Sequence, residues 1–157
     1  MIETSYVNQE TFNKMQQDLQ QLKTVDRYAA SKAIAEAREK GDLKENAEYD
    51  AAKEAQGLLE ARIKYMEGVL ATTRILDESN IDTSRVSVLT RVTLTNQATR
   101  KTVTYKLVSE QEADLKSGKI SVASPIGSGI LGKEIGDVVE VSVPVGKIKF
   151  SIDKIEI

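Results

Sequence analysis

Residues 37–49 read Ala-Arg-Glu-Lys-Gly-Asp-Leu-Lys-Glu-Asn-Ala-Glu-Tyr, and this stretch separates two runs with helical periodicity. On its N-terminal side a 3-4-3 spacing places large apolar residues on one helix face, at Phe12, Met15, Leu19 and Leu22. The next position of that seam is Asp26, and small residues then take over, at Ala29, Ala30, Ala33 and Ala37. On the C-terminal side a near-heptad seam runs through Ala52, Ala55, Leu59, Ile63, Met66, Leu70 and Thr73. Two amphipathic helices joined by a turn as short as Gly41-Asp42 are predicted to lie antiparallel, each covering the seam of the other.

The composition changes near residue 77, where helix-forming residues give way to Val, Ile and Thr, both prolines and six of the nine glycines. Apolar residues alternate over residues 85–96, 102–108, 137–143 and 148–157, which predicts strands, and the alternation shifts phase in the last of these between Ile152 and Ile155. Pro144–Lys147 is a hairpin turn signal. Residues 110–116 suit a short helix that Gly118 ends, and residues 124–132 suit a loop or a helical turn. The predicted fold class is α+β: a long antiparallel α-helical coiled-coil hairpin over residues 1–76, a linker over residues 77–85, and a small, mostly antiparallel β domain over residues 86–157.

The composition excludes several classes of function. The chain has no cysteine and no histidine, so it cannot form disulfides, a zinc site with thiolate or imidazole ligands, or a catalytic site that uses either side chain. A net charge of −2 with both signs mixed argues against a broad basic surface that wraps nucleic acid. No apolar run approaches the roughly 18 residues of a membrane span, so we expect a cytoplasmic protein with no membrane partner.

Two carboxylates in the turn, Asp42 and Glu45, have two interpretations. In the structural one, Gly41 ends the first helix, Asp42 caps the second, and Glu45 completes a capping box. In the functional one, two carboxylates at the end of a slender projection contribute oxygen ligands to a Mg²⁺ ion. Because Mg²⁺ needs further ligands, such a site would work only where another macromolecule supplied them.

Two long motifs resemble the signatures of the GreA/GreB family of transcription elongation factors. The first runs from Ile34 to Tyr49 and continues as Ala51-Ala52-Lys53-Glu54. The second is Ile120-Ser-Val-Ala-Ser-Pro-Ile-Gly127, followed by Leu131-Gly-Lys-Glu134 and Gly136-Asp137. The resemblance covers the whole chain with both domains in the expected order, and the slightly acidic hairpin favours the GreA branch over the GreB branch.

The resemblance implies a function and a set of site residues. The hairpin would enter the secondary channel of bacterial RNA polymerase, where the tip acids Asp42 and Glu45 help to hold a catalytic Mg²⁺ and orient a water. The polymerase would then hydrolyse the 3′ end of backtracked RNA, so the chain is not an enzyme alone and has no cofactor in isolation. An FKBP-like C-terminal domain would dock at the channel mouth, with Ser124, Pro125 and Ile126 as contact candidates. We expect the factor to be a monomer.

Several residues near the tip keep alternative interpretations. Arg38, Lys44 and Tyr49 are candidates for contact with RNA, whereas the basic side chains equally suit a solvated helix face and Tyr49 equally suits packing against the first helix. Glu48 is a third acid that two carboxylate ligands would make unnecessary.

Related architectures offer other functions. An inhibitory paralogue that plugs the channel would crowd aspartates at the tip, whereas Leu43 and Lys44 separate the two acids here. A peptidyl-prolyl isomerase needs an aromatic-lined pocket, and the C-terminal half contains only Tyr105 and Phe150. A zinc-containing channel regulator is excluded by the absence of cysteine. A plain coiled-coil adaptor would tolerate other capping residues in place of Asp42 and Glu45.

Overall fold

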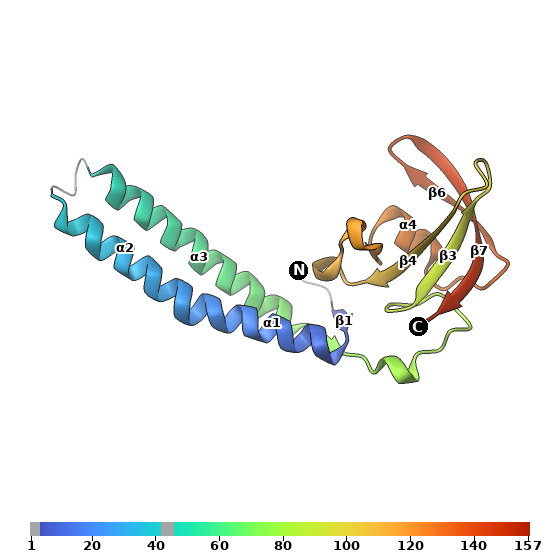
Figure 1. Cartoon of the computed structure of the whole chain (residues 1–157), viewed down its shortest axis with the longest axis horizontal. Helices are drawn as coiled ribbons and strands as arrows, with labels where there is room; N and C mark the ends of the chain where they lie inside the picture. The colour runs from blue at the N-terminus through green and yellow to red at the C-terminus, as the bar shows by residue number, and fades with distance from the viewer. Residues whose placement is uncertain (1–3, 42–45) are drawn as a thin grey trace. The chain divides into compact units, whose positions relative to one another are not determined.

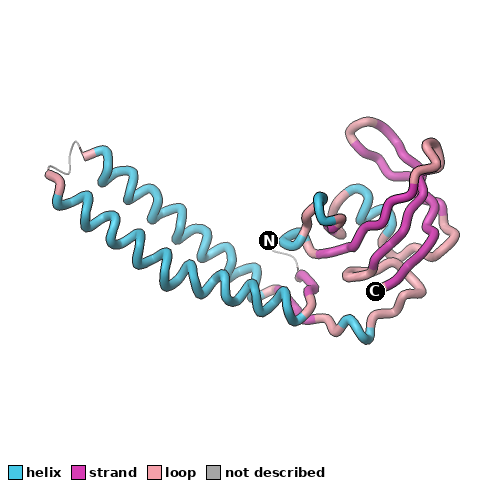
Figure 2. Tube along the Cα trace, in the orientation of Figure 1, coloured by secondary structure: helices cyan, strands magenta, loops and turns pink. Residues whose placement is uncertain are grey.

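The computed structural model describes residues 4–41 and 46–157 and divides the chain into two compact units (Figures 1 and 2). One unit is the helical hairpin of residues 10–73, and the other combines residues 5–9 with residues 74–157. Asp42, Lys44 and Glu45, three of the predicted site residues, lie outside the described residues. No helix in the described part of the chain is both long and apolar enough to cross a membrane.

The first arm of the hairpin consists of α1 (Gln9–Gln21), a π-helical turn η1 (Leu22–Asp26) and α2 (Arg27–Glu39). Backbone angles on both sides of η1 are helical, so the arm is continuous. A π turn holds one more residue than an α turn and therefore rotates every later side chain about the helix axis.

This rotation changes the seam that the periodicity predicted. Ala29 and Ala33 are exposed, whereas Ile34 and Ala37 are buried. The predicted continuation through Ala29 and Ala33 is therefore wrong, because the heptad count assumed α-helical geometry across residues 22–26. In the second arm, α3 (Ala47–Ala71), the heptad count holds, except that Gln56 takes the half-buried position predicted for Ala55.

The second unit is built on a curled five-stranded sheet with the order β5-β4-β3-β7-β6 (Figure 1). Its strands are β3 (Arg91–Asn96), β4 (Thr102–Val108), β5 (Lys119–Ser121), β6 (Val138–Val143) and β7 (Gly146–Glu156). Every pairing is antiparallel except β4 with β5. The short strands β1 (Ser5–Val7) and β2 (Thr73–Ile75) form a separate ladder. These elements confirm the α+β prediction.

The core of this unit is made by alternate side chains of the strands together with α4 (Pro125–Ile130). The periodicity predicted a phase shift in the last strand between Ile152 and Ile155, and the register with β3 does shift there, between Thr93 and Leu94. The strand predicted from residue 85 begins only at Arg91, because Leu89 has a left-handed backbone (φ 70°) and breaks the alternation. In place of the short helix predicted over residues 110–116, the structure has two 3₁₀ turns, η3 (Glu110–Glu112) and η4 (Leu115–Ser117). Gly118 ends the second with φ 73°, as predicted. A further 3₁₀ turn, η2 (Glu78–Asn80), lies in the predicted linker.

Candidate functional site

The hairpin tip is held by Asn46, whose side chain bonds both arms. Its Oδ1 accepts a hydrogen bond from the backbone N–H of Tyr49 at 3.1 Å, which caps the N-terminus of α3. Its Nδ2 donates to the backbone carbonyl of Ala37, near the C-terminus of α2, at 2.7 Å. One side chain therefore satisfies an end group of each helix, and it fixes the separation of the two arms next to residues 42–45.

The cap of α3 differs from the one that the sequence predicted. Asn46 has extended backbone angles (φ −89°, ψ 97°), and helical geometry starts only at Ala47. The prediction that Asp42 caps this helix, with Glu45 in a capping box, is therefore wrong. The interpretation of the two tip acids as the cap of α3 is not supported, because the N-cap of this helix is Asn46.

Two further contacts join the arms on either side of the tip. The Arg38 guanidinium lies 5.8 Å from the centre of the Tyr49 ring, a cation–π distance, and Tyr49 is half-buried. Lys40 Nζ lies 2.8 Å from Glu48 Oε2, and the hydrogen bond with Glu48 raises the pKa of Lys40 above its usual value. Tyr49 thus packs against the first arm, which was one of its two interpretations, and Glu48 is paired with a lysine.

The residue types of the chain limit which metals it could bind. No group of three or more acidic, histidine or cysteine side chains that could hold a metal ion occurs within residues 4–41 and 46–157. The sequence has no cysteine or histidine for a thiolate or imidazole zinc site, whereas its carboxylate and carbonyl oxygens fit a hard cation such as Mg²⁺.

The predicted docking segment occupies α4 and the turn before it. Ser124 caps α4: its hydroxyl accepts from the backbone N–H of Gly127 at 3.1 Å and donates to the Ser121 carbonyl at 2.6 Å. A Cβ on Gly127 would lie 2.1 Å from that same carbonyl oxygen, so only glycine fits there. Pro125 is exposed and Ile126 is half-buried. Of the three predicted contact residues, Pro125 presents its side chain to solvent, whereas the Ser124 hydroxyl positions the turn.

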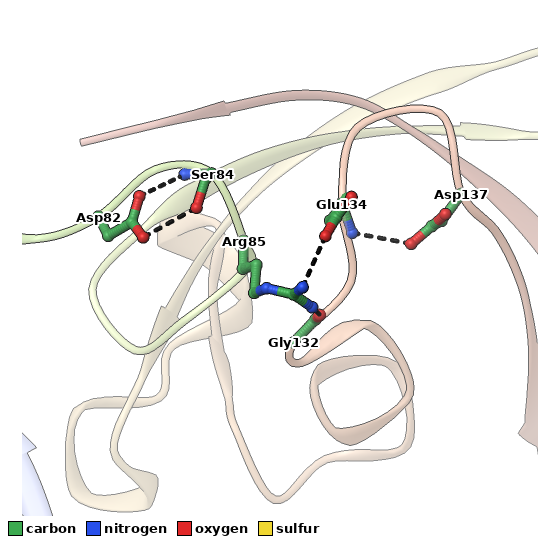
Figure 3. A network of polar contacts seen from close by, with 6 residues as sticks. All are labelled: Asp82, Ser84, Arg85, Gly132, Glu134 and Asp137. Carbon is green, nitrogen blue, oxygen red and sulfur yellow. Dashed lines mark hydrogen bonds and ion pairs between the residues drawn. The ribbon is translucent and has the colours of Figure 1, made fainter.

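The far end of this segment is bound to the chain that precedes the sheet (Figure 3). Backbone hydrogen bonds join Gly132 N–H to the Val86 carbonyl and Val86 N–H to the Lys133 carbonyl, both at 2.8 Å. Arg85 adds an ion pair to Glu134 at 2.8 Å and a hydrogen bond to the Gly132 carbonyl at 3.3 Å. Residues 124–132 are thus held at both ends, and the exposed Pro125 is on a rigid support.

Sequence reasoning missed two of these features. The N-cap role of Asn46 could have been predicted, because asparagine is a preferred N-cap and acidic residues follow it in the first turn, at Glu48 and Asp50. The π turn at residues 22–26 was harder to predict, because its one indication in the sequence was a polar residue, Asp26, at a seam position.

Two family models match the chain. One describes the N-terminal domain of a transcription elongation factor and matches residues 5–75. The other describes the C-terminal domain of the GreA/GreB transcription elongation factors and matches residues 81–157. The chain belongs to the GreA/GreB family of transcription elongation factors. The predicted resemblance is confirmed.

Relatives within the GreA/GreB family are similar over nearly their whole length. Transcription elongation factor GreA of Christiangramia forsetii is 56% identical over 155 residues, which cover 99% of this chain and 98% of that protein. The GreA of Flavobacterium psychrophilum is 54% identical over 97% of this chain and 96% of its own length. A solved structure of GreA factor homolog 1 (Gfh1) of Thermus thermophilus is 27% identical with a TM-score of 0.46, covering 98% of this chain and 99% of that chain.

Proposed function

We propose that this transcription elongation factor binds bacterial RNA polymerase, inserts its hairpin tip into the secondary channel and stimulates the polymerase to cleave the 3′ end of backtracked RNA. The chain does not cleave RNA alone, and it acts as a cytoplasmic monomer. The observation that carries the proposal is the tip: Asn46 caps α3 and bonds the opposite arm, so Asp42 and Glu45 are not needed as the cap of that helix. We propose that these two acids instead serve a ligand outside the hairpin.

The tip acids would act as part of a metal site whose remaining ligands belong to the polymerase. Magnesium, when bound there, would supply electrostatic stabilisation of the reacting phosphate. Asp42 and Glu45 would add two negative charges and oxygen ligands to an ion that the polymerase alone holds weakly. The hydrogen bond from Asn46 to the Ala37 carbonyl fixes the separation of the two arms that carry the tip.

The sheet unit would dock on the polymerase through the segment around Pro125 and hold the tip near its target. Tethering the tip in this way raises its effective concentration at the channel without any new contact at the tip itself. Arg38 and Tyr49 pack on each other beside the tip, and we propose that this pair, together with Lys44, lies next to the RNA.

The decisive experiment removes charge at the tip and keeps shape. Asp42→Asn and Glu45→Gln are compared with Glu48→Gln, a matched control one turn further along, in a cleavage assay on a halted, backtracked elongation complex. Both tip variants should lose most of the stimulation while still competing with the wild type for polymerase, whereas Glu48→Gln should retain it. Raising Mg²⁺ should restore part of the lost activity by mass action.

Three outcomes would contradict the proposal. Full activity in both tip variants would exclude the metal role of Asp42 and Glu45. RNA products from the factor and Mg²⁺ without polymerase would show that it is itself a nuclease. A wild-type factor that slows elongation and yields no cleavage products would instead support the inhibitory function of a channel-plugging paralogue.

A further inference from the structure

The two flanks of the hairpin differ in how their charged side chains are paired. On one flank Arg27 makes a two-pronged ion pair with Glu60, Nε to Oε1 and Nη2 to Oε2, both at 2.9 Å. Lys23, four residues before Arg27 in the first arm, forms an ion pair with Glu67 of α3, with 3.2 Å between Nζ and Oε1. These bridges cross from the first arm to α3 and close this flank, which we call the sealed flank.

The other flank contains a cavity of about 300 Å³ between the π turn and α3. It is lined by Asp18, Gln21, Leu22, Asp26, Arg62 and Met66. Within the described parts of the chain, the three charged members of this set, Asp18, Asp26 and Arg62, make no ion pair or side-chain hydrogen bond. Charged side chains that share a cavity and remain unpaired are available to a ligand.

Two residues of the π turn, Leu22 and Asp26, line the cavity. Asp26 ends this turn at a half-buried position of the seam, as the heptad spacing predicted, where a coiled coil normally has an apolar side chain. Leu22 is buried and Met66 half-buried, so the cavity has an apolar floor beneath its carboxylates. π turns inside α-helices occur frequently at functional sites, which agrees with a binding role here.

Large exposed apolar side chains lie one helical turn from two residues that line the cavity, Gln21 and Arg62. Leu58 and Tyr65 lie four residues before and three residues after Arg62, so they are its neighbours on the helix face, and their exposed fractions are 68% and 57%. Val25, four residues after Gln21 on the first arm, is 61% exposed. Single exposed apolar residues are ordinary, but three of them at helical spacing from the lining of a cavity with unpaired charges have the composition of a protein–protein contact.

We infer that this open flank is the face of the hairpin that packs against RNA polymerase, and that the cavity receives one cationic side chain, Arg or Lys, of the polymerase. This inference rests on the proposed function. The lining contains two carboxylates, Asp18 and Asp26, and one guanidinium, Arg62, so its net charge is negative and it favours a cationic ligand. The aliphatic stem of an Arg or Lys would lie on Leu22 and Met66, while its charged end reaches Asp18 and Asp26.

The test compares two double variants with the same change of charge on opposite flanks. Asp18→Asn with Asp26→Asn removes the acids of the cavity, and Glu60→Gln with Glu67→Gln removes the acids of the sealed flank. Each full-length protein competes with labelled wild type for polymerase elongation complexes. We expect the Kd of the cavity variant to rise about tenfold and that of the control to change less than about threefold. In the cleavage assay the half-saturating concentration of the cavity variant should rise in parallel, with a much smaller change in maximal rate.

Circular dichroism of both variants establishes that the hairpin is folded, and asparagine has nearly the same size and helix propensity as aspartate. Equal affinities of the two double variants would overturn the inference, because long-range charge alone would then explain the loss. The competition assay also separates this inference from the proposed function. A wild-type factor that binds polymerase and stimulates no cleavage would refute the proposed function, while the comparison of the two flanks would still decide where the polymerase packs.

Discussion

Replacing Asn46 should loosen the hairpin tip more than any other single change in the described residues that flank it. Asn46→Ala removes both the cap of α3 and the bond to the Ala37 carbonyl. Asn46→Ser keeps a capping oxygen but is too short to reach the opposite arm, and it is the matched control for the bond to Ala37. The three proteins therefore separate the contribution of the cap from that of the contact between the arms.

The expected magnitudes follow from the two hydrogen bonds. Loss of an N-cap costs about 1 kcal/mol, and loss of a half-buried hydrogen bond costs about 1 kcal/mol. The alanine variant should thus destabilise the tip by about 2 kcal/mol and the serine variant by about 1 kcal/mol. These values would raise the equilibrium constant for local opening of the tip roughly 30-fold in the alanine variant and roughly 5-fold in the serine variant.

Amide hydrogen exchange measures this opening directly, because the Tyr49 N–H donates to Asn46 and the Lys40 N–H donates to the Ala37 carbonyl. Exchange at both amides should accelerate in the order wild type, serine, alanine, while amides of the sheet core stay unchanged. Cleavage stimulation should fall in the same order, since the two arms that carry the tip are then held together less well. Wild-type exchange rates at Tyr49 in the alanine variant would show that Asn46 does not stabilise the start of α3.

Three further outcomes can be checked by unfolding measurements. Gly127→Ala should destabilise the sheet unit by about 1–3 kcal/mol, because the new Cβ would lie 2.1 Å from the Ser121 carbonyl oxygen; a urea midpoint equal to that of the wild type would contradict this contact. Gly57→Ala should stabilise the hairpin by up to about 1 kcal/mol, since Gly57 lies inside α3 with open space around its Cα; a lower midpoint would show that the glycine has a structural role. The hydrogen bond from Arg27 lowers the pKa of Glu60 in the folded protein. The pair therefore stabilises the hairpin fully at pH values above the unfolded-state pKa of about 4.3. This stabilisation is lost as the pH falls through the lower pKa of the folded state. Thermal midpoints should thus drop on acidification, and Glu60→Gln should show a smaller drop.

Much of the fold could be predicted because it depends on local periodicity. The heptad of α3, the alternation in β6 and β7, and the phase shift before Ile155 follow from which residues are apolar and how far apart they lie. The family motifs are likewise contiguous stretches. These properties do not depend on which distant segments meet, so the sequence alone contains them.

Three features were decided by contacts that periodicity does not contain. The π turn moves Ile34 into the seam in place of Ala33, and whether a helix takes up an extra residue depends on how it packs against the other arm. The choice of Asn46 over Asp42 as the cap depends on the reach of an amide to Ala37 in the opposite arm. The parallel pairing of β4 with β5 depends on the path of the intervening 3₁₀ turns.

The sequence by itself determined the family, the two-unit architecture and the candidate acids at Asp42 and Glu45, because each is written in adjacent or regularly spaced residues. Only the tertiary structure decided that Asn46 is the cap of α3, that Arg38 and Tyr49 pack together, and that one flank of the hairpin is sealed while the other has a cavity. The physical reason is the same in each case. Hydrogen bonds, ion pairs and cavities form between side chains that are distant in sequence, and a one-residue rotation of a helix changes all of them together.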